Sequence, residues 1–341
     1  MRRILASFLV SLAVVAGCSG DDSDTSSPDP TETTEGSSST VDATTTTAPP
    51  APPTVDELLA GGRVLNIPHA GGDQDFPHST MYAFSEAVAA GADVLEFDIR
   101  VTADDVVVVH HDADTAKTTP ESLVVAETDL ATLQALDKAY WFSPECWPCQ
   151  DRAEEEYVFR GVRTGDVEPP EGYTAEDFRM VTLAELDERF PEVPFDIEIK
   201  GEGAAGVRNA EALARALDDL GRTDSTVVVS FDSEIVAAFH EAAPDVATSP
   251  GVAEMTAWLL AGEPLADHHR VVQVPPAFDG VEVLSADSIA KAHADGLAVW
   301  VWMDSPADQE NQAFYSSLVA LGVDGIIAGR PAAAEAAIAG A

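Results

Sequence analysis

Residues 94–112, VLEFDIRVTADDVVVVHHD, place acidic and imidazole side chains within and directly after two runs of Val, Leu, Ile and Phe. Apolar strands normally exclude charge, because an unpaired buried carboxylate is energetically expensive. Glu96 and Asp98 are two residues apart, so an extended strand directs both side chains to the same side. His111 follows the second run. We therefore expect two strands that present polar side chains to a common site.

The rest of the chain alternates short apolar runs with Ala-rich helical patterns. Buried, β-branched strands that are each followed by a helix are typical of a parallel sheet covered by helices. About eight such units predict a TIM (β/α)8 barrel, an α/β fold, rather than an open doubly wound sheet. Strands are expected at 63–68, 94–100, 106–110, 195–200, 226–231, 270–274, 298–303 and 324–328, with a weaker candidate at 246–249. Helices are expected at 79–90, 128–138, 182–189, 205–220, 233–242, 253–261, 285–295, 307–321 and 331–340.

The N-terminal segment has the features of an export signal. Residues 1–18 carry two arginines directly after Met1, continue with an apolar run that is too short to span a bilayer, and end in VAGC. VAGC resembles a bacterial lipobox, which predicts lipidation of Cys18 and anchoring at the outer face of the cell membrane; ordinary signal-peptide cleavage and secretion is the alternative. Residues 19–54 are rich in Ser, Thr, Pro and Asp, which predicts a disordered linker. The folded domain is expected at 55–341.

The charge of the chain excludes two classes of partner. The formal net charge is -42, which argues against nucleic-acid binding and against attraction to anionic lipid surfaces. The lipid anchor is therefore the only membrane contact that we expect, and no protein partner is evident. An anionic substrate must be attracted locally, by a metal ion or by a few basic side chains.

A loop-like insertion at about 140–178 interrupts the strand–helix alternation. Insertions of this length in a barrel are often lid or rim elements that shape substrate access. The insertion contains Cys146 and Cys149 in PECWPCQ. Two nearby cysteines in an exported protein usually pair, so we expect a disulfide. A redox motif would require a helix start after a strand, and a zinc site would require two further ligands nearby.

Polar residues gather at the predicted strand ends, where barrels build their sites. They are His69, Glu96, Asp98, His111, Glu198 and Lys200. Each residue alone has a structural explanation; Glu198 and Lys200, for example, form a plausible surface ion pair. Together, three carboxylates repel one another unless a cation lies among them, and hard divalent ions such as Mg²⁺ and Ca²⁺ take oxygen ligands. Two histidines beside such an ion are suited to acid–base catalysis.

The order of these motifs resembles that of the glycerophosphodiester phosphodiesterases, a family of TIM-barrel enzymes. The family pattern is His-Arg-Gly, Pro-Glu-Asn-Thr, Glu-x-Asp, His-Asp and Glu-x-Lys. The corresponding stretches here are HAG (69–71), PHST (77–80), EFD (96–98), HD (111–112) and EIK (198–200). VTLAEL (181–186) and LGVDGIIAGRP (321–331) also match. The resemblance covers essentially all of 63–340.

The resemblance implies a function for most of the polar residues. It makes Glu96, Asp98 and Glu198 the ligands of one divalent cation, Ca²⁺ or Mg²⁺. It makes His69 and His111 the acid–base pair, without assigning which histidine is the acid. The implied reaction is hydrolysis of a small glycerophosphodiester to glycerol phosphate and an alcohol.

Two further residues are assigned to substrate binding by the resemblance, and three others depart from the family pattern. Lys200 is implied to contact the phosphate, and Trp302 falls where the family has an aromatic residue that lines the pocket. Ala70 replaces the family arginine, which removes a bidentate phosphate contact. His78 and Ser79 replace the glutamate and the asparagine of Pro-Glu-Asn-Thr, and Arg160, Arg163 or His78 is a candidate for holding the substrate instead. These departures indicate altered substrate binding more than a loss of catalysis.

Two alternative functions remain open on the sequence. A phospholipase D-like enzyme that acts on intact lipids uses similar chemistry on a similar barrel. A non-catalytic surface lipoprotein that binds a ligand is the second alternative, and Ala70 is the best support for it.

Overall fold

The computed structural model describes residues 50–144 and 146–341. The predicted export signal, Cys18 and most of the predicted linker therefore lie outside the described residues. The first described helix, α1 (Val55–Ala60), begins after Thr54, which accepts a hydrogen bond from the backbone of Glu57 in a capping box. Within the described residues, no helix combines the length and the hydrophobicity that crossing a bilayer requires.

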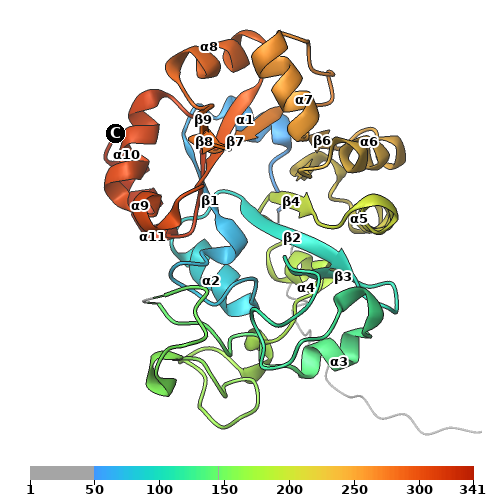
Figure 1. Cartoon of the computed structure of the whole chain (residues 1–341), viewed down its shortest axis with the longest axis vertical. Coiled ribbons are helices and arrows are strands. Elements are labelled where there is room, and N and C mark those ends of the chain that lie inside the picture. Colours follow the sequence, from blue (N-terminus) through green and yellow to red (C-terminus); the bar gives the residue numbers. More distant parts are fainter. Residues whose placement is uncertain (1–49, 145) are drawn as a thin grey trace, which may run out of the picture. The chain divides into compact units, whose positions relative to one another are not determined.

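Two sheets lie at the centre, and Figure 1 shows helices arranged around them. The strands of the first sheet, in spatial order, are β1 (Leu65–Pro68), β11 (Gly325–Ala328), β10 (Ala298–Trp302) and β7 (Val271–Val274). Those of the second are β3 (Val107–Val109), β2 (Leu95–Val101), β4 (Phe195–Ile199), β5 (Thr226–Val229) and β6 (Ala247–Thr248). All of these strand pairs are parallel except β2–β3.

Contacts at both edges connect the two sheets. A parallel bridge joins Thr248 of β6 to His269, just before β7. At the other edge, the backbone N–H of Asp93 donates to the carbonyl of Asn66 in β1 at 2.8 Å. The parallel strands therefore follow one another in the order in which they occur in the sequence, as a (β/α)8 barrel requires.

The prediction that 106–110 is one of the parallel strands is wrong. β3 pairs antiparallel with β2, with Val109 opposite Ile99. The reason is the length of the connection, because a parallel crossover needs about a dozen residues or more, and only a tight turn joins these strands. The weaker candidate at 246–249 contains the parallel strand β6 instead. As a result, β3 returns along β2, and the backbone N–H of His110 donates to the carbonyl of Asp98 at 2.9 Å.

The observed helices follow the predicted positions closely. They are α2 (Met81–Ala89), α3 (Leu130–Ala135), α4 (Leu183–Arg189), α5 (Gly203–Leu220), α6 (Ser233–Ala242), α7 (Val252–Thr256), α8 (Ala286–Ala294), α9 (Pro306–Gln309), α10 (Gln312–Leu321) and α11 (Pro331–Ala339). The helix expected at 307–321 is divided into α9 and α10, because the side chain of Asn311 caps a new helix by accepting from Phe314 N. The helix expected at 253–261 is α7 followed by a π-helical turn, Ala257–Ala261.

The insertion packs against α2 and forms a small hydrophobic cluster of its own. Val162 and Phe178 are buried there against Tyr82 of α2. Cys146 and Cys149 form a disulfide, with their Cα atoms 5.6 Å apart. A short hairpin that the sequence analysis missed lies between β7 and α8, with strands β8 (Ala277–Phe278) and β9 (Val281–Glu282).

Candidate active site

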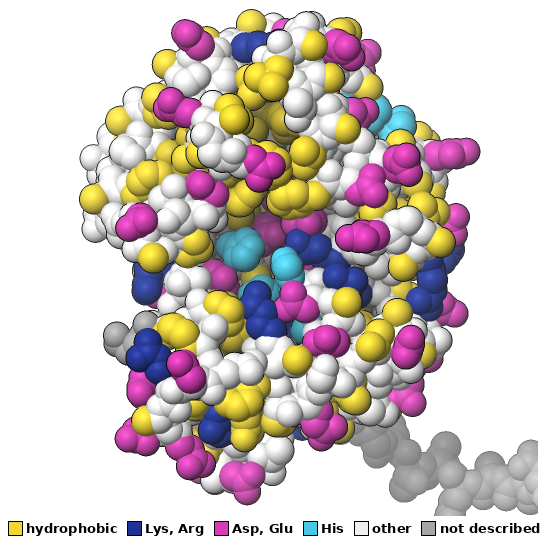
Figure 2. Space-filling model, viewed as in Figure 1, with side chains coloured by type: hydrophobic (Ala, Val, Ile, Leu, Met, Phe, Trp, Pro, Cys, Tyr) yellow, Lys and Arg dark blue, Asp and Glu magenta, His cyan; other side chains and the backbone are white. Residues whose placement is uncertain are grey.

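A pocket of about 580 Å³ lies at the carboxyl ends of the parallel strands. Figure 2 shows a hollow in which histidine, acidic and basic side chains gather. The sequence-predicted residues that line the pocket are His69, Glu96, His111, Glu198, Lys200 and Trp302. Asp98 is buried directly beside them, within ion-pair distance of Lys200. The fold therefore brings together residues that are up to 233 positions apart in the sequence, from His69 to Trp302.

His69 follows β1 in a tight turn, and a carboxylate fixes its orientation. Gly71 in this turn has φ of 84°, and a Cβ there would lie 2.9 Å from the Cβ of Ala83, so both conformation and space require glycine. His69 Nδ1 lies 3.3 Å from Asp73 Oδ1. Burial disfavours the charged imidazole, but the carboxylates of Asp73 and Glu96 outweigh it and raise the pKa of His69 well above its ordinary value.

The two carboxylates of β2 are buried and have different partners. Glu96 Oε2 accepts a hydrogen bond from the backbone N–H of Ala70 at 2.8 Å. Burial raises the pKa of Glu96 to about 8, and the neighbouring Asp98 acts in the same direction. Burial opposes ionisation of Asp98 as well, but Lys200 and nearby histidines outweigh it and hold the pKa of Asp98 below its ordinary value. Asp98 Oδ2 has no hydrogen-bond partner within the described residues.

Glu198 and Lys200 come from the neighbouring strand β4 and the residue that follows it. The parallel register places Glu198 beside Asp98. Lys200 Nζ lies 2.6 Å from Glu198 Oε1 and 3.0 Å from Asp98 Oδ1. Burial raises the pKa of Glu198, while Lys200 opposes this shift. The ammonium group that the sequence assigns to phosphate is therefore held between two of the predicted metal ligands.

The donor set has the chemistry of a hard-cation site. Its ligands are oxygen atoms only, and one of them, Asp98 Oδ2, is buried without a partner. In 50–144 and 146–341, however, no group of three acidic, histidine or cysteine side chains is arranged to hold a metal ion. Lys200 lies between two of these carboxylates, where its ammonium group neutralises Asp98 and Glu198. The residues thus fit a divalent cation by chemistry, provided that Lys200 withdraws.

His111 has the same kind of partner as His69. Its Nδ1 lies 2.9 Å from Asp112 Oδ1, and its backbone carbonyl accepts from Arg100 Nε at 2.9 Å. In both histidines the carboxylate on Nδ1 favours the orientation that presents Nε2 to the pocket.

His78, one of the residues that the sequence offered as a candidate for holding the substrate, lies close to both histidines. Its ring centroid is 6.1 Å from that of His69 and 6.3 Å from that of His111. His78 is buried, and Nδ1 lies 2.8 Å from Ser79 Oγ. Burial, reinforced by the neighbouring cations, lowers the pKa of His78 well below its ordinary value. In the sequence, His78 is marked by its position in PHST, where the family pattern has glutamate. Because its pKa is lowered, the His78 ring beside His69 and His111 is neutral.

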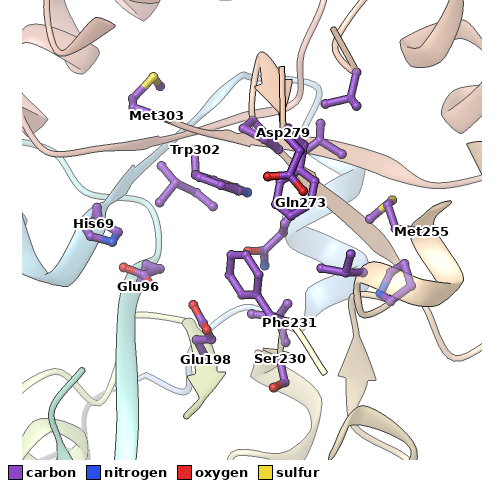
Figure 3. Close-up of a pocket in the computed structure, with 18 of the residues that line it drawn as sticks. His69, Glu96, Glu198, Ser230, Phe231, Met255, Gln273, Asp279, Trp302 and Met303 are labelled. Atoms are coloured by element: carbon purple, nitrogen blue, oxygen red, sulfur yellow. The ribbon is translucent and has the colours of Figure 1, made fainter. Parts of the chain in front are cut away.

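Aromatic side chains complete the walls of the site. Trp302 at the end of β10 lies with its ring centroid 5.8 Å from that of Phe231, and both rings line the pocket (Figure 3). Trp147 of the insertion lies 6.0 Å from the ring of His78. The loop that the Cys146–Cys149 disulfide closes thus lies beside His78.

The model of the glycerophosphoryl diester phosphodiesterase family matches residues 69–333. The chain belongs to this family. As a member, it is an enzyme, a phosphoric diester hydrolase. Glycerophosphoryl diester phosphodiesterases generally depend on a divalent metal ion, which agrees with the oxygen donor set described above.

Proteins similar to this chain occur in bacteria and animals. YhdW of Bacillus subtilis, named for the same activity, is 27% identical over 265 residues, which cover 78% of this chain and 94% of that protein. A human protein named lysophospholipase D GDPD3 is 28% identical over 185 residues, 53% of this chain and 49% of that one. The structure of an Oleispira antarctica phosphodiesterase in complex with the product sn-glycerol-3-phosphate superposes with a TM-score of 0.61 at 17% identity, covering 82% of this chain and 99% of that chain. At this identity the superposition shows a shared fold.

Proposed function

We propose that this protein is an exported, metal-dependent glycerophosphodiester phosphodiesterase that hydrolyses glycerophosphodiesters to glycerol phosphate and an alcohol. One observation supports this most strongly. Two histidines, His69 and His111, line the same pocket as the buried carboxylates, and each has a carboxylate on Nδ1. Paired imidazoles of this kind are suited to moving two protons in one reaction. Two sheets in barrel order support a (β/α)8 barrel as the scaffold.

Glu96, Asp98 and Glu198 hold one divalent cation in this proposal, Ca²⁺ or Mg²⁺. When bound, the cation neutralises charge on a phosphate oxygen and polarises the phosphorus centre. Its charge is needed because the acidic side chains that line the pocket outnumber Lys200, which is the sole Lys or Arg among the described lining residues. An anionic phosphodiester is repelled by such a pocket unless a cation compensates.

The two histidines transfer the protons. One imidazole Nε2 accepts a proton from the attacking water, and the other donates a proton to the alkoxide that leaves the phosphorus. Asp73 and Asp112 orient the two rings and stabilise the imidazolium form. Ala70 stands where the family has an arginine, so Lys200 is left to contact the phosphate oxygen. It does so once the cation has displaced its ammonium group from Asp98 and Glu198.

The location belongs to the same proposal. The sequence of residues 1–18, with its VAGC ending, supports export and lipidation at Cys18, which holds the enzyme at the outer face of the bacterial cell membrane. Residues 19–54 then tether the catalytic domain to this anchor.

The test is hydrolysis of glycerophosphocholine by the purified protein, first in EDTA and then after Ca²⁺ or Mg²⁺ is added back. We expect turnover that EDTA abolishes and one of the two ions restores. Glu96→Gln and His111→Gln should each lower kcat at least a hundredfold with an unchanged circular dichroism spectrum. Failure to hydrolyse any member of a panel of glycerophosphodiesters in either metal would refute the proposal.

A further inference from the structure

A carboxyl group that the proposed reaction does not use lies in the wall of the pocket near His69. Glu310 lies in the break between α9 and α10, and it lines the pocket together with Asp73 and His69. Glu310 Oε2 accepts hydrogen bonds from the backbone N–H of Gly329 at 2.9 Å and from the hydroxyl of buried Tyr315. Because both donors bind the same oxygen, the other oxygen of the carboxyl group is left to carry a proton.

The absence of a side chain at Gly329 brings the carboxyl groups of Asp73 and Glu310 together. A Cβ at this position would lie 2.7 Å from Asp73 Oδ1 and 3.1 Å from Glu310 Cδ, so the two groups flank the same point. Gly329 is not among the residues with positive φ, so space rather than backbone conformation requires glycine here. Its carbonyl accepts from the backbone N–H of Gln74 at 3.0 Å, which holds the turn that carries Asp73 at the end of β11.

The charge of Glu310 determines whether Asp73 is repelled. Asp73 Oδ1 lies 3.3 Å from His69 Nδ1, and two carboxylates around one point would oppose this contact. Burial raises the pKa of Glu310 to about 7, and the negative charge of Asp73 acts in the same direction. Hydrogen bonds from Tyr315 and Gly329 oppose the shift in this pKa, as does the imidazole of His69. Glu310 is therefore protonated below about pH 7, where it does not repel Asp73, and becomes a repelling carboxylate above it.

Other charged groups in the segments around Glu310 have partners elsewhere. Arg330 follows β11 and acts on Tyr315, but its guanidinium group pairs with Asp75. The acidic side chains just before Glu310 accept hydrogen bonds from their own segment; they are Asp304, bonded to Gln309, and Asp308, bonded to Ser305. Asp73 is therefore the carboxylate on which ionisation of Glu310 acts.

We propose that Glu310 is a positioning residue for His69: in its protonated form it allows the Asp73 carboxylate to stay on His69 Nδ1, and Gly329 provides the space in which these groups meet. This inference rests on the proposed function, in which His69 transfers a proton, and it deepens the role of that histidine. Ionisation of Glu310 pushes Asp73 away, so the orientation of the imidazole is lost as pH rises through about 7.

The first experiment measures kcat/KM for glycerophosphocholine from about pH 6 to pH 9, in the metal ion that supports turnover, for the wild type and Glu310→Gln. Glutamine keeps hydrogen-bonding atoms but does not ionise. We expect the two proteins to agree within about twofold at pH 6, and the variant to exceed the wild type about threefold or more at pH 9. A ratio that does not change with pH would overturn the inference. Absence of turnover in the wild type would refute the proposed function instead.

Gly329→Ala tests the space between the two carboxyl groups. The added methyl group displaces Asp73 from His69, so we expect kcat to fall about tenfold or more while KM changes by less than about threefold. Gly61→Ala is the matched control, because Gly61 has φ of −64°, a Cβ there would lie 3.2 Å from a backbone carbonyl, and it does not line the pocket. Equal kcat values for the two variants would contradict the positioning role. If Gly329→Ala does not fold, Glu310→Gln, which adds no bulk, decides the case.

A titration of Glu310 keeps the test independent of catalysis. ¹³C NMR of its carboxyl carbon, assigned with Glu310→Gln, gives the pKa of Glu310 in the wild type and in Asp73→Asn. We expect a pKa near 7 in the wild type and a lower one in Asp73→Asn, because the repelling charge is gone. Asp112→Asn is the matched control and should leave this pKa unchanged, because Asp112 contacts His111 and lies 3.9 Å from Lys117. An equal pKa in the wild type and Asp73→Asn would overturn the inference, whether or not the protein hydrolyses phosphodiesters.

Discussion

Lys200 is the residue whose replacement tests the electrostatics of the site most sharply. Its ammonium group lies 2.6 Å from Glu198 and 3.0 Å from Asp98, and its side chain is only 13% exposed. At an effective dielectric constant of about 20, each attraction has a gross magnitude of roughly 6 kcal/mol, much of which desolvation cancels. Removing one partner of a buried pair leaves uncompensated charge, which typically costs about 3–5 kcal/mol. We therefore expect Lys200→Met to lower the free energy of unfolding in EDTA by about 3–5 kcal/mol.

Lys291→Met is the matched control. Lys291 Nζ lies 2.8 Å from Asp295, so the separation is similar, but this pair is 33% and 44% exposed. Exposed ion pairs contribute about 0–1 kcal/mol, so we expect a change no larger than that. Both variants are unfolded in urea with EDTA, and then again with Ca²⁺ or Mg²⁺ present.

A divalent cation should stabilise the Lys200→Met variant more than the wild-type protein, because the cation no longer competes with an ammonium group. At one hundred times its Kd, a bound ion adds about 2.7 kcal/mol. If Lys200→Met costs no more than Lys291→Met in EDTA, the carboxylates are not held by Lys200 and the reasoning is wrong. If either ion stabilises the variant and the wild type equally, the cation does not compete with the ammonium group of Lys200.

Three further predictions follow from individual contacts. Asp112→Asn should lower kcat by about 10- to 100-fold with little change in urea stability, because Asp112 orients His111; an unchanged kcat would contradict this role. Burial raises the pKa of Glu310 to about 7, above its ordinary value of 4.5, so the protonated form is favoured in the folded state and stability is lost as pH rises through about 7. Glu310→Gln should therefore have the same unfolding free energy as the wild type near pH 4 and a higher one, by about 1–3 kcal/mol, at pH 8. A difference in unfolding free energy that does not depend on pH would refute this. Arg222→Met should cost about 3–5 kcal/mol in urea unfolding, because buried Arg222 pairs with Asp187 and donates to two backbone carbonyls; a cost below 1 kcal/mol would contradict it.

The positions of the strands and of the polar residues follow from local sequence patterns. Spacing of two along β2 predicts that Glu96 and Asp98 share a side, and the structure places both at the site. The direction of β3 was predicted wrongly, because a run of valines has the same appearance in a parallel and an antiparallel strand. Only the length of the connection distinguishes the two cases.

Contacts between distant segments could not be predicted from the sequence. The ion pairs of Lys200 with Asp98 and Glu198 depend on the register of β2 and β4, which the spacing within one strand does not define. The position of His78 close to His69 and His111 depends on how the loop after β1 folds. The apolar part of the pocket is lined by the β8–β9 hairpin, which the sequence analysis did not predict, and by the segment of α7.

The central claim is that the paired histidines cleave a phosphodiester at phosphorus. The most direct measurement is ³¹P NMR of glycerophosphocholine incubated with the purified protein and its metal ion in water enriched in ¹⁸O. We predict glycerol phosphate that carries one ¹⁸O on phosphorus, and no such product from the His69→Gln/His111→Gln double variant. Choline and glycerol phosphate without ¹⁸O on phosphorus, or an undiminished rate in the double variant, would contradict the claim.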